Sequence, residues 1–137
     1  MTNEDQIREL QALWGQRHAD RDAAGWSQLW VEDGTFVNPR GGEVVGREAL
    51  QAYFTERYMS AERRTTHVFG LPVIRIDGDS ATSATDYLSS SREGDAATVA
   101  GAIGRVLARY VRRDGRWLFA EYRIVNHPDP LPRVDVW

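Results

Sequence analysis

The sequence contains no cysteine and no lysine among its 137 residues, so all 17 basic residues are arginines. The absence of cysteine excludes thiol nucleophiles, iron–sulfur clusters, thiolate zinc sites and disulfide bonds. The absence of lysine excludes Schiff-base chemistry on an internal amine and the phosphate-binding lysine of P-loop proteins. A catalytic site in this chain must therefore use other side chains.

The chain also lacks an excess of positive charge and long apolar runs. Its net charge is −3 and its pI is near 5.6, which gives no electrostatic indication of nucleic-acid binding. No apolar run approaches the ~18 residues of a membrane span. The polar N-terminus MTNEDQIREL has no apolar segment of the kind found in signal peptides. We therefore expect a cytoplasmic protein without nucleic-acid or membrane partners.

The spacing of the histidines and arginines gives little indication of a metal site or an anion site. The three histidines are widely spaced, with no His-x-His or Glu-x-x-His string, so we expect neither a metal site nor a cofactor. Arginines do gather near the C-terminus, where acidic residues are interleaved with them. This favours a solvated or subunit-contacting sheet face over a phosphate-binding patch. These arginines are Arg105, Arg109, Arg112, Arg113, Arg116 and Arg123.

The first half of the chain predicts three helices within a single domain spanning residues 1–137. The first covers Thr2–Ala19, with Asn3 as N-cap and apolar residues at helical spacing. The second follows Asp22 and ends at residues 32–34. The third begins after Gly46, and its buried face consists of Leu50, Tyr53, Phe54 and Tyr58.

The second half predicts a series of strands separated by turn residues. Helices followed by strands indicate an α+β fold, with the helices packed on one face of a mainly antiparallel sheet. Along residues 99–111, even positions are small and apolar, which fits either tight helix docking or a ligand cavity. The expected strands are 35–37, 43–45, 66–76, 80–90, 99–111 and 117–125.

Three strings carry a family resemblance: HADRDAAGWSQLWVEDGTFVNPRGGEVVGREALQAYF, RRTTHVFGLPVIRIDGDSATSATDYL and RYVRRDGRWLFAEYRIVNH. Together they resemble the SnoaL-like branch of the nuclear transport factor 2-like superfamily. The resemblance implies a curved sheet wrapped by three helices into a cone, a pocket at its open end, and a homodimer. It does not fix an activity, because this fold hosts enzymes, binders and scaffolds.

Within that superfamily, the site pattern is most similar to scytalone dehydratase, the bile-acid dehydratases and hexachlorocyclohexane dehydrochlorinase. Asp20 and His67 stand where those enzymes have a catalytic Asp–His pair. The resemblance implies a cofactor-independent lyase or isomerase, in which His67 removes a proton and Asp20 orients the ring. The substrate would be a small, largely apolar metabolite bearing a carbonyl or hydroxyl group. Expected substrate-binding residues are Trp14, Asn38, Tyr53, Tyr58, Phe69, Asp86 and Tyr122.

Other readings stay open. The ketosteroid isomerase pattern is disfavoured, because Asn38, Trp14 and Ala108 stand where that mechanism needs acid–base groups. An epoxide hydrolase could use Asp86 with a water held by Asn38, but no arginine can be assigned beside Asp86. A non-catalytic small-molecule binder or dimeric assembly protein is the main alternative. It predicts a closed cavity filled by side chains and no contact between Asp20 and His67.

Overall fold

The computed structural model describes residues 1–59, 63–93, 96–127 and 131. Two helices open the chain, α1 (Asn3–Ala19) and α2 (Ala23–Ser27), and the hairpin β1 (Trp30–Asn38) and β2 (Gly42–Val45) follows. Helix α3 (Arg47–Phe54) runs on into a single π-helical turn, η1 (Thr55–Met59). The remaining strands are β3 (Arg63–Phe69), β4 (Val73–Asp77), β5 (Ser80–Glu93), β6 (Ala96–Arg113) and β7 (Arg116–Asn126).

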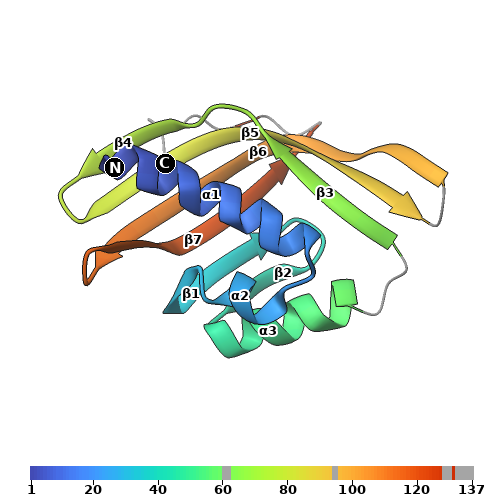
Figure 1. Ribbon diagram of the computed structural model, residues 1–137, viewed down its shortest axis with the longest axis horizontal. Coiled ribbons are helices and arrows are strands. Elements are labelled where there is room, and N and C mark those ends of the chain that lie inside the picture. Colours follow the sequence, from blue (N-terminus) through green and yellow to red (C-terminus); the bar gives the residue numbers. More distant parts are fainter. Residues whose placement is uncertain (60–62, 94–95, 128–130, 132–137) are drawn as a thin grey trace.

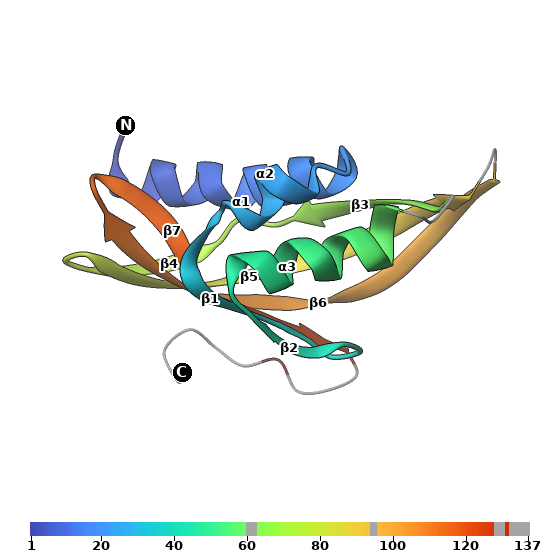
Figure 2. The same ribbon diagram turned by 90° about the horizontal axis from the view of Figure 1, so that it is seen from below.

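The seven strands form one sheet in the order β2-β1-β7-β6-β5-β3, with β4 also paired to β5. Every pairing is antiparallel except that of β1 with β7. The long strands β5 and β6 curve, and α1 and α3 lie on the inner side of the curve (Figures 1 and 2). This arrangement agrees with the cone that the resemblance implies, and the predicted α+β class is confirmed.

Three of the differences between predicted and observed boundaries have a clear physical reason. Strand β1 begins at Trp30, which sequence spacing assigned to the second helix. Here Trp30 is fully buried and pairs with Phe119 of β7, so sheet packing outweighs the helical spacing. The run 66–76 is divided by Gly70, Leu71 and Pro72 into β3 and β4, since proline cannot donate to a strand ladder. Finally, the N-cap of α1 is Thr2, which forms a capping box with Asp5.

The predicted inward face of β6 is observed. Gly104, Val106, Ala108 and Tyr110 are all buried on the side that faces the helices. Gly104 is required by backbone proximity, because a Cβ atom there would lie 2.1 Å from the carbonyl oxygen of Val125 on β7. Small residues thus allow close approach at this part of the sheet.

A buried polar network joins α1 to the sheet. The Gln11 side-chain amide donates to the hydroxyls of Ser83 at 3.1 Å, Thr85 at 3.0 Å and Tyr110 at 2.8 Å. All four side chains are buried. Because unpaired buried hydroxyls are costly, the network fixes where α1 crosses β5 and β6.

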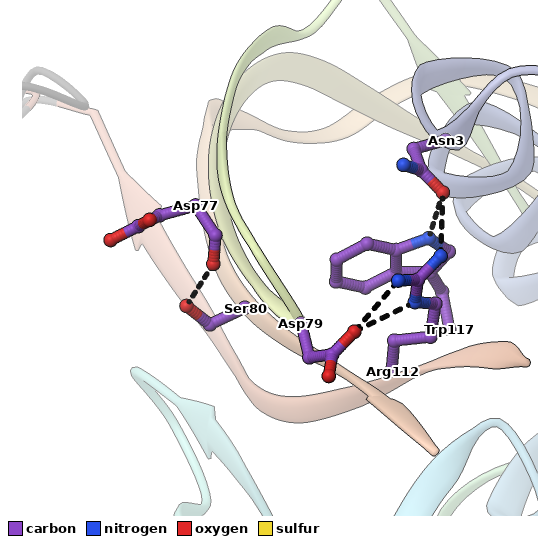
Figure 3. Close-up of polar contacts among 6 residues, drawn as sticks. All are labelled: Asn3, Asp77, Asp79, Ser80, Arg112 and Trp117. Atoms are coloured by element: carbon purple, nitrogen blue, oxygen red, sulfur yellow. Dashed lines mark hydrogen bonds and ion pairs between the residues drawn. The ribbon is translucent and has the colours of Figure 1, made fainter. Parts of the chain in front are cut away.

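The N-terminal end of α1 is tied to the sheet by a second cluster (Figure 3). The Asn3 side-chain oxygen accepts from the Trp117 indole at 3.1 Å and from Arg112 at 3.4 Å. Arg112 also pairs with Asp79 at 2.8 Å and lies over the Trp117 ring. Asn3, expected as the cap of the helix, instead connects its first turn to β6 and β7.

Candidate functional site

A pocket of about 540 Å³ opens between the helices and the inner face of the sheet. Its described lining comes from α1, α2, η1 and five strands, so residues far apart in the sequence meet there. The lining is Trp14, His18, Trp26, Phe36, Asn38, Arg40, Arg57, Tyr58, Thr65, His67, Tyr87, Ser89, Ser91, Gly101, Ala102, Ile124 and Asn126.

Two histidines face each other in this pocket. The ring centroids of His18, on α1, and His67, on β3, are 4.6 Å apart at an interplanar angle of 73°. The Nδ1 atom of each ring is buried and has no hydrogen-bond partner among the described residues. His18 is only 4% exposed, although it was not among the site residues expected from the sequence. Its helical spacing from the apolar Trp14 was the signal that could have revealed it.

Burial keeps both imidazoles neutral. It lowers the pKa of His67 to about 4, and together with the nearby His67 it lowers that of His18 to about 3. At neutral pH both rings are therefore unprotonated, and each has one nitrogen able to accept a proton.

Aromatic rings form the inner wall around this pair. Trp14 stacks on Tyr122 with centroids 4.8 Å apart and meets His67 edge-to-face at 4.9 Å. Tyr58 lies across His18 at 4.4 Å. These contacts fix the orientation of both histidine rings without polar partners.

Another part of the lining is polar and comes from β3, β5 and β7. The Tyr87 hydroxyl donates to the Asn126 side-chain oxygen, and the Thr65 and Ser91 hydroxyls are 3.1 Å apart. Burial raises the pKa of Tyr87 to about 12, which keeps its phenol protonated. The pocket therefore combines apolar rings with groups able to bind ligand oxygens.

The two catalytic residues expected from sequence are separated in the structure. Asp20 is exposed as the C-cap of α1 and is not among the described residues that line the pocket, whereas His67 is. Within the described part of the chain, no hydrogen bond or ion pair joins Asp20 to His67, and His18 occupies the position beside the ring. The helix ends one residue before Asp20, so its side chain leaves the buried face.

The position of Asp86 also differs from the expectation. It was expected in the pocket, but its side chain is 66% exposed on the outer sheet face and pairs with Arg105 at 2.6 Å. Its neighbours Thr85 and Tyr87 point inward instead, because side chains alternate along a strand. An arginine does reach Asp86, but outside the cone, so the geometry gives no support to an epoxide hydrolase.

The remaining candidates divide into lining and supporting residues. Trp14, Asn38 and Tyr58 line the pocket with His67. Tyr53, Phe69 and Tyr122 are not part of its described lining but contact the rings that are. Sequence reasoning did not single out these lining residues: His18, Trp26, Phe36, Arg40, Arg57, Thr65, Tyr87 and Asn126.

The described residues offer neither a candidate metal site nor a candidate membrane span. No group of three or more histidine, aspartate or glutamate side chains there is arranged to hold a metal ion. None of the described helices is both long and apolar enough to cross a membrane.

Comparison with known proteins agrees with this geometry. The chain is similar to Rv3472 of Mycobacterium tuberculosis, solved as a variant and described as of unknown function, with 26% identity and a TM-score of 0.81 over 88% of this chain and 69% of that one. A nuclear transport factor 2-like protein with a cystatin-like fold from Novosphingobium aromaticivorans has 24% identity and a TM-score of 0.81, over 92% and 82% of the two chains.

A third solved structure, from Catenulispora acidiphila in complex with S-DNPA, has 21% identity and a TM-score of 0.80, over 89% and 91% of the two chains. No curated protein sequence matches the chain. The sequence profile of the SnoaL-like domain matches residues 1–123. The chain therefore belongs to the SnoaL-like domain family.

Proposed function

We propose that this protein is a cofactor-independent lyase or isomerase that transfers protons on a small, oxygenated ring compound, with His67 as the base. The observation that carries the proposal is the pair of neutral imidazoles, His18 and His67, on the wall of a pocket of about 540 Å³. SnoaL-like domains are associated with polyketide cyclase- or isomerase-type reactions and with ligand binding, and the ligand complex of the Catenulispora protein supports a small-molecule pocket.

The reaction that fits the lining is loss of water from a β-hydroxy ketone. His67 takes the proton from the carbon next to the carbonyl, and a carbon–carbon double bond forms as the carbon–oxygen bond breaks. The proton then passes from His67 to the leaving hydroxyl, so water leaves and the imidazole returns to its neutral state. His18 acts as a positioning residue, because its ring packs against His67 where Asp20 was expected.

A direct test uses 3-hydroxy-1-tetralone, whose dehydration gives the fluorescent product 1-naphthol. We expect His67→Gln to slow product formation by at least about 100-fold, the lower end of general-base contributions. His127→Gln is the matched control, because His127 is exposed beyond β7. Circular dichroism and thermal unfolding would show that both variants fold. Equal rates for His67→Gln and the unchanged protein would overturn the assignment.

The second candidate is a non-catalytic binder. It is favoured by one observation: no carboxylate holds the Nδ1 atom of His67, which has no hydrogen-bond partner among the described residues. Trp14 and Trp26 line the pocket, so ligand entry can be followed by quenching of tryptophan fluorescence. Saturable quenching by 3-hydroxy-1-tetralone without 1-naphthol formation would favour the binder over the enzyme.

We also propose that the protein is a homodimer formed through the outer face of the sheet. Val68, Leu88 and Ile103 pair in register across β3, β5 and β6, and their side chains are 54%, 42% and 52% exposed. This forms an apolar stripe on three adjacent strands, of the kind that association covers.

A further inference from the structure

We infer that the pocket takes ligands that bear a carboxylate, held by Arg40 and Arg57 at the mouth with the ring system among the aromatic side chains. The inference rests on this pocket being the ligand site of the proposed function, but not on any reaction there. It names a substrate class: ring-containing organic acids.

The first support is charge. Arg40 and Arg57 line the pocket, and its described lining contains no aspartate or glutamate. Both arginines are exposed, so they lie where the pocket meets solvent. The whole chain has a net charge of −3, which means that this positive charge is local to the pocket.

The two arginines have no carboxylate partner among the described residues, unlike Arg105 and Arg112 on the outer strands. The Arg57 guanidinium lies 5.5 Å from the centre of the Tyr53 ring and hydrogen-bonds to the Tyr58 hydroxyl. These contacts orient it and use only part of its five N–H donors. Arg40 lies near Tyr58 and Tyr87: burial raises the pKa of both phenols, and the Arg40 charge acts against that rise.

The second support is that the polar side chains of the described lining favour hydrogen-bond donors over acceptors. The side-chain oxygen of Asn38 accepts from the Arg40 backbone N–H at 2.9 Å, and that of Asn126 accepts from the Tyr87 hydroxyl. Each amide therefore has its NH₂ group left for a ligand.

A carboxylate matches both features. It only accepts hydrogen bonds, and its two oxygens fit the planar donor fork of a guanidinium. A neutral ligand of the same shape leaves the arginine charges uncompensated. The inner aromatic wall of Trp14, Phe36 and Tyr58 then packs against a planar hydrocarbon body.

The test compares 2-naphthoate with 2-naphthamide, which has nearly the same shape but no charge. Isothermal titration calorimetry on the full chain at neutral pH should give at least about tenfold tighter binding of the carboxylate, the scale of a charge-assisted hydrogen bond. The double variant Arg40→Gln/Arg57→Gln should bind both probes equally, with its affinity for the amide unchanged. The control Arg113→Gln removes the same type of charge from an exposed position at the β6–β7 turn and should keep the preference.

Equal affinity of the unchanged protein for the two probes would overturn the inference, as would a preference that survives in the double variant or disappears in Arg113→Gln. Failure of 2-naphthoate to bind up to its solubility limit would also overturn it. The proposed reaction is judged separately, because His67→Gln should keep the carboxylate preference even where it abolishes turnover. Loss of the preference with turnover intact would reject the ligand class alone.

Discussion

His18 and His67 meet edge-to-face with their ring centroids 4.6 Å apart, although one comes from the last turn of α1 and the other from β3. Burial removes the charge from both rings, and the aromatic side chains around them fix their orientation. The contact links the proposed chemistry to the stability of the fold. Protonation would place a buried charge on either ring and so destabilise the packing around the pocket.

Acid should destabilise the protein through these rings. In the unfolded chain each imidazole has its ordinary pKa of 6.5, whereas in the folded protein the values are about 4 for His67 and about 3 for His18. Below pH 6.5 the unfolded state therefore binds more protons, and this part of the stability, present above pH 6.5, is lost as the pH falls toward 4. We expect a loss of about 2 kcal/mol per histidine between pH 6.5 and 5, at about 1.4 kcal/mol per pH unit.

Urea unfolding at several pH values measures this slope. His67→Gln should remove one histidine's share of it, while His127→Gln should leave it unchanged, because that ring is exposed. A slope in His67→Gln equal to that of the unchanged protein would contradict the burial of a neutral ring at this position.

Asp20→Asn should change the rate of 1-naphthol formation by less than about twofold, because Asp20 is exposed and lies outside the described pocket lining. His18→Asn should lower the rate by about tenfold or more, because it removes the ring that positions His67. Steady-state kinetics at neutral pH measure both variants. A loss for Asp20→Asn as large as that for His67→Gln would show that the Asp–His pair expected from the sequence forms during turnover.

Gln11→Leu should destabilise the fold by about 1–3 kcal/mol, since it leaves the hydroxyls of Ser83, Thr85 and Tyr110 without their shared donor. Urea unfolding at neutral pH gives the free energy. Gln16→Leu is the matched control on an exposed position of the same helix and should stay within about 0.5 kcal/mol of the unchanged protein. Equal changes in the free energy of unfolding at the two positions would mean that the Gln11 network does not stabilise the fold.

Leu88→Glu should convert a dimer into monomers, because it places a charge at the centre of the apolar stripe of Val68, Leu88 and Ile103. Val45→Glu, at the opposite edge of the sheet and 53% exposed, is the control and should remain dimeric. Light scattering after size-exclusion chromatography measures both masses. A monomeric unchanged protein at high concentration would refute the dimer.

The sequence predicted the fold class and the inward face of β6, because there the small apolar residues alternate clearly with Arg105 and Arg109. The orientation of Asp86 could not be read in the same way. On β5 both faces carry small or hydroxyl-bearing residues, so nothing in the pattern fixes which positions point inward. The pocket assignment of Asp86 was therefore wrong.

The site was only partly predictable. His67 was singled out by the resemblance to enzymes with a catalytic Asp–His pair, and it does line the pocket. Its neighbour His18 was missed because a histidine near a helix end is usually exposed, although its spacing from Trp14 placed it on the same buried face of α1. Arg40 and Arg57 were missed because no local pattern distinguishes an arginine at a pocket mouth from one on the surface.

Helix α1 carries the Asn3 cluster at one end, the Gln11 network in its middle and the His18 ring at the other. At 1.5 Å per residue these attachments extend along about 22 Å of one stiff rod. Because the helix is stiff, a change in its tilt at the Asn3 end also displaces the His18 end. Substitutions at Asn3, Arg112 or Trp117 would thus shift the His18 ring against His67, so ligand preference can evolve through residues that no ligand touches.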